Sequence, residues 1–232
     1  MIVSAAAKIC GLVRTEDAKA SWSAGARYVG AILAGGPRLV TPAGARAVFD
    51  SAGAATRVVV VGHEPVDDIV RAGMSAGADI IQLHGDPSPR MVLDLRERWP
   101  GGIWAALRVP PQSFDQERAA ALFSVADGVV LDAFVDGALG GTGVSIDWRA
   151  VQPKLQAVRD AADASALLIV AGGLTPENVQ TAIRLLSPDV VDVSSGVESE
   201  PGIKDHARVQ RFVAAARGDR VDGDQLSFAG VQ

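Results

Sequence analysis

The strongest constraint on the fold is a strict alternation between short apolar runs and longer segments rich in Ala, Arg, Leu and Glu. Each apolar run is nearly continuous, which is typical of parallel strands covered on both faces. Successive runs begin about 27 residues apart, close to the minimum for a βα unit in a compact barrel. The expected strands are residues 2–9, 27–33, 57–62, 79–84, 102–108, 127–132, 167–172 and 190–195. The expected helices are residues 15–24, 42–54, 65–76, 88–98, 115–124, 147–160, 176–186 and 204–217.

This order of elements predicts an α/β protein, a single (β/α)8 TIM barrel with an eight-stranded parallel sheet, over residues 1–217. A doubly wound open sheet is the alternative, but even spacing favours closure, which leaves no exposed sheet edge. No Pro/Ser-rich linker divides the chain, and residues 218–232 are expected to form a polar C-terminal tail. A capping residue followed by proline marks three expected helix starts, at Thr41, Ser88 and Thr175.

Charge and composition argue against several classes of function. The net charge of −5 disfavours a general nucleic-acid-binding surface, although a small anionic ligand needs only a local positive site. No apolar stretch approaches the roughly 20 residues that a membrane-spanning helix needs, and the N-terminus carries no secretory-signal pattern. The single cysteine cannot form an intramolecular disulfide, which predicts a cytoplasmic or other reducing location.

Active sites of (β/α)8 barrels lie at the carboxyl ends of the strands, so the first candidates follow the first apolar run. Lys8 and Cys10 share parity and are expected to point inward. A thiol near an ammonium group has a lowered pKa and can act as a base or nucleophile; the alternative is that Cys10 is a small buried apolar residue. An inward lysine needs a partner, and we expect Asp192 of the neighbouring last strand to pair with Lys8.

A carboxyl group follows the sixth apolar run. Asp132 is poorly placed there for stability, and a carboxyl in a partly apolar barrel mouth has a raised pKa and can donate a proton. The alternative is a helix cap or a turn residue. The Gly-rich segment 140–143 comes next and is either ligand-lining or an ordinary flexible loop.

Small residues end the last two strands, in "AGGLTPENV" and "SSGVES". Loops after strands 7 and 8 form the recurring phosphate site of this fold, where backbone N–H groups bind the anion. Two ordinary glycine turns are the alternative. We therefore predict phosphate binding by the following residues: Gly172, Gly173, Ser194, Ser195 and Gly196.

Three more polar residues follow strand ends. Arg38 can hold a carboxylate through two parallel hydrogen bonds, or it is simply a solvated surface residue. Gln82 and His84 share parity and are candidates for substrate contact. The chain has three histidines without metal-ligand spacing, so no metal site is expected.

Several segments in order resemble the phosphoribosylanthranilate isomerase family of tryptophan biosynthesis. They are "KICGLVRTEDA", "GARYVGAILAGGPRLVTP", "IIQLHGD", "LDAFVDGALGGTGVSIDW", "LIVAGGLTPENV" and "VDVSSGVESEPGIKD", between residues 8 and 205. The resemblance implies an enzyme that performs an Amadori rearrangement of a small phosphorylated aminoaldose, N-(5'-phosphoribosyl)anthranilate, to the corresponding ketose. It implies no metal or organic cofactor, because the protonated imine is itself the electron sink.

The resemblance also implies residue roles. Cys10 matches the family's general base and Asp132 its general acid. Arg38 matches the residue that holds the anthranilate carboxylate, and Gly141 would flank the substrate. The sequence leaves open a monomer or a homodimer.

Two other hypotheses remain at this point. A metal-dependent phosphate-binding barrel enzyme, such as a ribulose-phosphate epimerase, would show paired His and Asp at strand ends. A phosphate-binding or assembly module without activity would tolerate the loss of Cys10 or Asp132.

Overall fold

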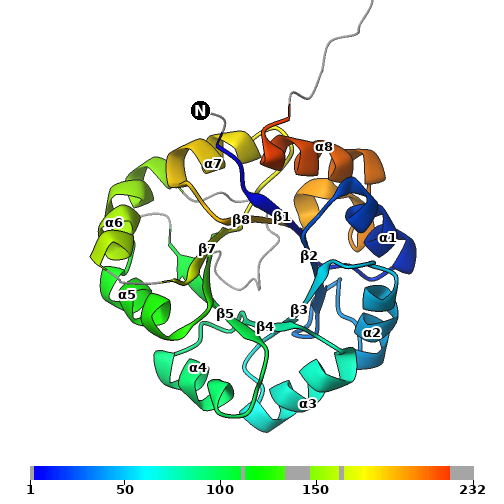
Figure 1. The fold of residues 1–232 in the computed structure, drawn as a ribbon, viewed down its shortest axis with the longest axis horizontal. Coiled ribbons are helices and arrows are strands. Elements are labelled where there is room, and N and C mark those ends of the chain that lie inside the picture. The colour runs from blue at the N-terminus through cyan, green and yellow to red at the C-terminus, as the bar shows by residue number, and fades with distance from the viewer. Residues whose placement is uncertain (1–2, 111–112, 134–146, 162–164, 220–232) are drawn as a thin grey trace, which may run out of the picture.

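Eight parallel strands close into a barrel in chain order, and the helices surround it (Figure 1). The computed structural model describes residues 3–110, 113–133, 147–161 and 165–219. The strands are β1 Ala6–Ile9, β2 Tyr28–Ile32, β3 Thr56–Val61, β4 Ile80–Leu83, β5 Gly102–Val109, β6 Gly128–Ala133, β7 Leu167–Val170 and β8 Val190–Val193. The helices are α1 Thr15–Ala24, α2 Pro42–Asp50, α3 Val66–Ala76, α4 Pro89–Arg96, α5 Gln116–Val125, α6 Trp148–Ala161, α7 Val179–Leu186 and α8 His206–Arg217. The predicted TIM barrel is confirmed, and the open sheet is excluded.

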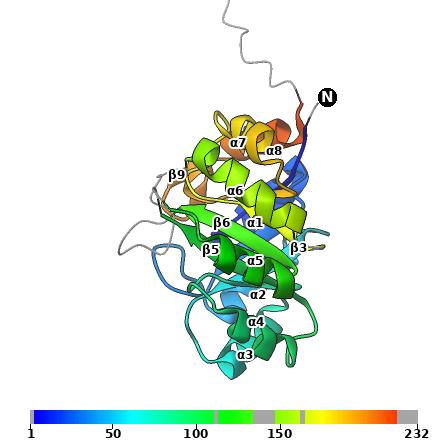
Figure 2. The same ribbon diagram turned by 90° about the vertical axis from the view of Figure 1, so that its left-hand side faces the viewer.

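Strand pleating divides the apolar side chains between two cores. Outward residues of the strands pack against the helices. For example, α5 and α6 cover the outer face of β5 and β6 (Figure 2). Inward residues fill the barrel itself, where the rings of Tyr28 and Trp104 lie 5.1 Å apart between centroids. Val58, Val130 and Ile169 complete this inner apolar layer. These side chains fill the interior of the barrel with apolar groups.

The barrel closes where β1 meets β8. Lys8 lies opposite Asp192 in the register of this parallel pair, and Ile9 lies opposite Val193. Since side chains alternate along a strand, this register turns both charged side chains inward. The closure therefore builds an ion pair into the barrel interior.

Helix starts agree with the prediction at two of three places. Thr41 accepts a hydrogen bond from Gly44 N, and Ser88 accepts one from Met91 N, so both are N-caps. The prediction for Thr175 is wrong, because α7 begins later, after Asn178. Asn178 Oδ1 accepts from Thr175 N at 2.8 Å, which closes a turn over these residues and delays the helix.

A small hairpin follows the last barrel strand and was not predicted. A short 3-10 helix η1, Ser195–Val197, leads into it, and its two antiparallel strands are β9, Glu198–Glu200, and β10, Ile203–Lys204. β7 and β8 also end earlier than expected, at Val170 and Val193. The residues beyond these ends leave the sheet and line the barrel mouth.

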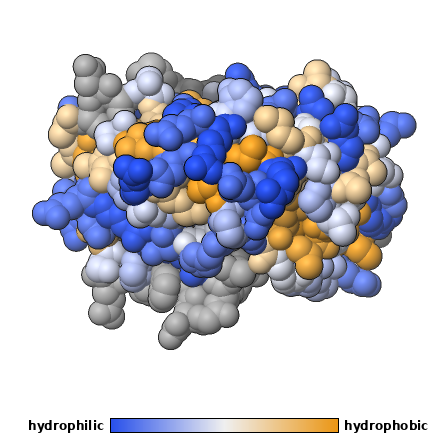
Figure 3. Space-filling view, turned by 90° about the horizontal axis from the view of Figure 1, so that it is seen from below, coloured by the Kyte–Doolittle hydropathy of each residue, from blue (hydrophilic) through white to orange (hydrophobic). Residues whose placement is uncertain are grey.

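Some predicted features lie outside the described residues. The segment 140–143, with Gly141, and residues 220–232 of the predicted tail are among them. No helix in the described ranges is both long and apolar enough to cross a bilayer. The face over α3 and α4 carries separate apolar patches between hydrophilic residues (Figure 3).

Candidate active site

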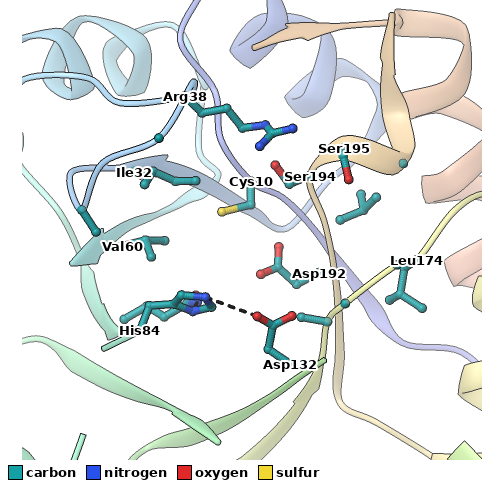
Figure 4. Close-up of a pocket in the computed structure, with 18 of the residues that line it drawn as sticks. Cys10, Ile32, Arg38, Val60, His84, Asp132, Leu174, Asp192, Ser194 and Ser195 are labelled. Carbon is teal, nitrogen blue, oxygen red and sulfur yellow. Dashed lines mark hydrogen bonds and ion pairs between the residues drawn. The ribbon is translucent and has the colours of Figure 1, made fainter. Parts of the chain in front are cut away.

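One pocket, with a cavity volume of about 280 Å³, opens at the carboxyl ends of the strands (Figure 4). Except for Gly141, whose position is not described, the predicted site residues all line it. They are Cys10, Arg38, Gln82, His84, Asp132, Gly172, Gly173, Ser194, Ser195 and Gly196. Residues that the sequence places up to 186 positions apart thus meet in one cavity, as barrel closure requires.

Cys10 follows β1 and has its thiol in the pocket. Its backbone N–H donates to Val193 O at 2.8 Å, which ties the residue to the end of β8. Gly30 of β2 makes room for the sulfur, since a Cβ at Gly30 would stand 2.8 Å from Sγ. Burial raises the pKa of the Cys10 thiol, although Lys8 acts in the opposite direction. The expected lowering of the thiol pKa is therefore wrong, because burial outweighs the neighbouring ammonium group.

Lys8 lies below the thiol, fully buried in the barrel. Its Nζ is 2.7 Å from Asp192 Oδ2 and 2.9 Å from Gln82 Oε1. Burial is the largest single effect and disfavours the charged form, but the charges and hydrogen bonds of Asp192 and Cys10 together outweigh it and raise the pKa of Lys8. The predicted Lys8–Asp192 pair is confirmed, and Lys8 is held as a cation.

Asp132 ends β6 with its carboxyl group in the pocket, where it is 4% exposed. His84 Nε2 lies 3.3 Å from Asp132 Oδ2 (Figure 4). Gly172, with a positive φ of 81°, lies beside the other oxygen, because a Cβ there would stand 3.1 Å from Asp132 Oδ1. Asp132 belongs to a strand and lines a cavity, so it is neither a helix cap nor a turn residue.

Gln82 lies in the pocket wall, and both ends of its amide have protein partners. Its Oε1 accepts from Lys8 Nζ at 2.9 Å, and its Nε2 is 3.4 Å from His84 Nδ1. Gln82 is 2% exposed. The amide therefore faces the protein more than the cavity.

Arg38 follows β2 and is not a solvated surface residue. Its Nε and Nη2 donate to the two carboxylate oxygens of Glu198 at 2.7 and 2.6 Å. Glu198 also accepts from Lys204 Nζ at 2.8 Å, and that Nζ donates to Ser194 O at 3.1 Å. This charged cluster of Arg38, Glu198 and Lys204 joins the hairpin to the pocket.

The charges of this cluster support each other. Burial disfavours a charged Glu198, but the hydrogen bonds from Arg38 and the charge of Lys204 outweigh it and lower the pKa of Glu198. Burial lowers the pKa of Lys204, against the attraction of Glu198. Glu198 and Lys204 were missed in the sequence because they belong to the hairpin; the only available signal was their charge close to a strand end.

Two tight loops form the other side of the pocket. Asn178 Nδ2 donates to Gly173 O at 2.8 Å and so shapes the loop after β7. A Cβ at Gly196 would stand 1.9 Å from Leu174 O, so the two loops pack at a distance that only glycine permits. Ser194 Oγ is buried and, among the described residues, has no hydrogen-bond partner. The loops thus present small residues and backbone to the cavity.

No cluster of three or more His, Cys, Asp or Glu residues suited to a metal ion occurs in the ranges that the structure describes. The pocket instead combines a thiol, a carboxyl, a guanidinium and two glycine-containing loops. This fold and this site define a (β/α)8-barrel enzyme with its active site at the carboxyl ends of the strands.

Comparison with known proteins identifies the family. Residues 7–215 match the family model described as N-(5'phosphoribosyl)anthranilate (PRA) isomerase. A protein of Pseudomonas fluorescens strain SBW25 named N-(5'-phosphoribosyl)anthranilate isomerase is 38% identical over 221 residues, which cover 90% of this chain and 94% of that protein. The chain belongs to the phosphoribosylanthranilate isomerase family, whose members are isomerases of tryptophan biosynthesis.

Solved structures agree. The crystal structure of phosphoribosyl anthranilate isomerase from Thermotoga maritima has a TM-score of 0.79 at 30% identity, covering 91% of this chain and 98% of that one. A structure of the enzyme in complex with reduced 1-(o-carboxyphenylamino)-1-deoxyribulose 5-phosphate has a TM-score of 0.75 at 30% identity, covering 91% and 98%. Family membership favours the isomerase over the epimerase and the inactive binding module.

Proposed function

We propose that this pocket catalyses the Amadori rearrangement of N-(5'-phosphoribosyl)anthranilate to 1-(2-carboxyphenylamino)-1-deoxyribulose 5-phosphate, with Cys10 as general base and Asp132 as general acid. The observation that carries the proposal is that a buried thiol and a buried carboxyl line the same cavity, from β1 and β6. The substrate class follows the ligand named for the related structure.

The reaction needs one acid and one base. Asp132 gives its proton to the ribose ring oxygen, the bond from that oxygen to C1 breaks, and the nitrogen lone pair forms a protonated C1=N imine. Cys10, as thiolate, then takes the proton from C2. The C2–H electrons form a C1=C2 bond, and the imine electrons return to nitrogen. The resulting enolamine tautomerises to the ketone.

The raised pKa of Cys10 is compatible with this role in the complex. The imine intermediate is a cation, and an adjacent positive charge favours the ionised form of a thiol. Lys8 adds a permanent positive charge beside the sulfur. The thiolate is therefore most favoured at the stage of the reaction that needs it.

The rest of the pocket has groups suited to both ends of the substrate. The ion pair with Glu198 uses two of the five N–H donors of Arg38, and the other three remain for the anthranilate carboxylate. We place the phosphate on the loops after β7 and β8, where backbone N–H groups of small residues bind anions. The proposed phosphate ligands are Gly172, Gly173, Ser194, Ser195 and Gly196.

The setting of the reaction follows from the same chemistry. The residues that we assign to catalysis need no metal or organic cofactor, because the protonated imine accepts the electrons. A thiol base must stay reduced, and we propose the cytoplasm as the location.

An activity assay tests the function. Substrate formed in situ from anthranilate and a phosphoribosyl donor should lose its anthranilate-type fluorescence when purified protein is added. The expected product is the ketose, identified by the 13C NMR signal of its C2 carbonyl carbon, since an isomerisation leaves the mass unchanged. A fluorescence that decays only at the rate of the protein-free control would refute the isomerase.

Replacing Arg38 with methionine should raise KM by about ten- to hundredfold, because a hydrogen bond to a charged group contributes about 1.5–3 kcal/mol. We expect kcat to change much less, since Arg38 binds a part of the substrate that does not react. The measurement is the steady-state rate as a function of substrate concentration.

The matched control for this variant is Arg90→Met on α4, whose side chain is 81% exposed and pairs only with Asp94. It should leave both constants unchanged. An unaltered KM in Arg38→Met, with normal folding, would argue against the carboxylate role.

A further inference from the structure

A continuous series of polar contacts crosses the barrel interior from β8 to Asp132. Its members, in order, are Asp192, Lys8, Gln82, His84 and Asp132. The successive distances are 2.7 Å, 2.9 Å, 3.4 Å and 3.3 Å. The series ends at the carboxyl group that we assign as the acid. Two of its members, Gln82 and His84, have no role in the mechanism so far.

The chemistry of each group gives this series one direction. A lysine ammonium group only donates, so the Gln82 atom at 2.9 Å from Lys8 Nζ must be the carbonyl oxygen. The amide NH2 of Gln82 then faces His84 Nδ1, and it too only donates. His84 Nδ1 must therefore accept, and the single proton of the neutral ring is on Nε2. Nε2 lies 3.3 Å from Asp132 Oδ2, a polar contact without hydrogen-bond geometry among the described residues.

Burial prevents these groups from exchanging partners easily. Lys8 is fully buried and Gln82 is 2% exposed, so little water is available to replace a lost hydrogen bond. Turning the Gln82 amide over would place its NH2 against the ammonium group, leaving two donors face to face. An unsatisfied buried polar group costs about 1–3 kcal/mol, and more when it is charged. The direction of the series is thus set by the cation at its start.

We propose that Lys8 and Gln82 are positioning residues that hold His84 as the Nε2–H tautomer and, through it, orient the acid. This inference rests on the proposed function of Asp132. The N–H on Nε2, 3.3 Å from Oδ2, favours negative charge on that oxygen, so the proton of the carboxylic acid is carried by Oδ1. That oxygen lies beside Gly172, where the absent side chain leaves it open to the cavity.

The opposite tautomer would work against the acid. With the proton on Nδ1, the bare Nε2 would accept a hydrogen bond from the protonated Asp132. The acidic proton would then be held on Oδ2, toward His84, and no longer on the oxygen beside Gly172. Asp132 would keep its position in the pocket but present the wrong oxygen to the substrate.

Nitrogen NMR on protein labelled with 15N-histidine reads the tautomer directly. The chain has only three histidines, and the His84 signals are assigned by their loss in His84→Asn. In the substrate-free protein, we expect a protonated Nε2 and an unprotonated Nδ1. A spectrum with the proton on Nδ1 would overturn the proposal. This readout needs no activity, so its failure is distinct from a failure of the isomerase function.

Two substitutions at Gln82 test whether its amide sets the tautomer of His84. Gln82→Glu places a carboxylate oxygen against His84 Nδ1, so the ring should carry a proton there, and the Nδ1 signal should move to the protonated position. Its kcat should fall about tenfold or more, as part of the contribution of the acid is lost, while KM changes less than threefold. Gln82→Met, of similar volume, removes both hydrogen bonds and should leave a mixture of tautomers.

The matched control retains the direction of the series. Arg90→Met, whose exposed side chain on α4 is not a member of the series, keeps it intact, so the His84 signals should stay as in the wild type. A fall in kcat in Gln82→Glu with unchanged His84 signals would overturn the role through His84. Should Gln82→Glu fail to fold, the wild-type spectrum and Gln82→Met decide.

Discussion

Cys10→Ser should lower kcat by at least about a hundredfold, the lower range for the removal of a positioned base. Serine keeps the size and shape of the side chain, but its hydroxyl does not ionise at neutral pH, so the C2 proton has no acceptor. The fluorescence assay gives kcat, and chemical denaturation gives the unfolding midpoint of both proteins. We expect the midpoint to change little, because Cys10 bonds its surroundings through its backbone N–H.

The pH profile adds an independent reading of the same prediction. A base acts when deprotonated, so kcat/KM should rise as pH increases through the pKa of the thiol in the free enzyme. Burial raises that pKa, so the rise in kcat/KM should occur at a pH above the ordinary pKa range of a cysteine. This rise should disappear in Cys10→Ser. Near-normal turnover of the folded variant would remove Cys10 from the mechanism.

Asp132→Asn should also lose at least about a hundredfold in kcat. The amide has the shape of the carboxyl group and can keep its place beside His84, but it has no acidic proton for the ring oxygen. The substrate then remains in its closed form. The measurement is again kcat, with product formation confirmed by the C2 carbonyl signal in 13C NMR.

The control is Asp50→Asn on α2, a carboxyl that is 63% exposed and pairs with Arg46 on the same helix. It should retain full activity, because nothing links it to the pocket. If Asp132→Asn kept most of the wild-type kcat, another group would have to protonate the ring oxygen.

The barrel and the composition of its mouth follow from local pattern. Continuous apolar runs at even spacing indicate parallel strands, and closure brings their ends together, so Cys10 and Asp132 share a pocket. The Lys8–Asp192 pair follows from parity and the adjacency of the first and last strands. These features depend only on periodicity and on the topology of the fold.

Other features depend on tertiary contacts that no local pattern reveals. The hairpin that brings Glu198 to Arg38 contains no apolar run to mark its strands. The pKa of Cys10 depends on the balance between burial and a nearby cation, and proximity in the sequence indicates only the cation. Thr175 has the expected capping chemistry, but Asn178 closes a competing turn over it.

The ion pair at the barrel closure has a consequence for biosynthesis of the chain. Lys8 emerges from the ribosome 184 residues before Asp192, the carboxylate that neutralises it. Until then, a nascent barrel lacking its final strand has an ammonium group that it cannot bury without a large loss of hydration energy. Premature compaction around the first strands is thereby disfavoured, and the interior can exclude water only once the last strand is in place.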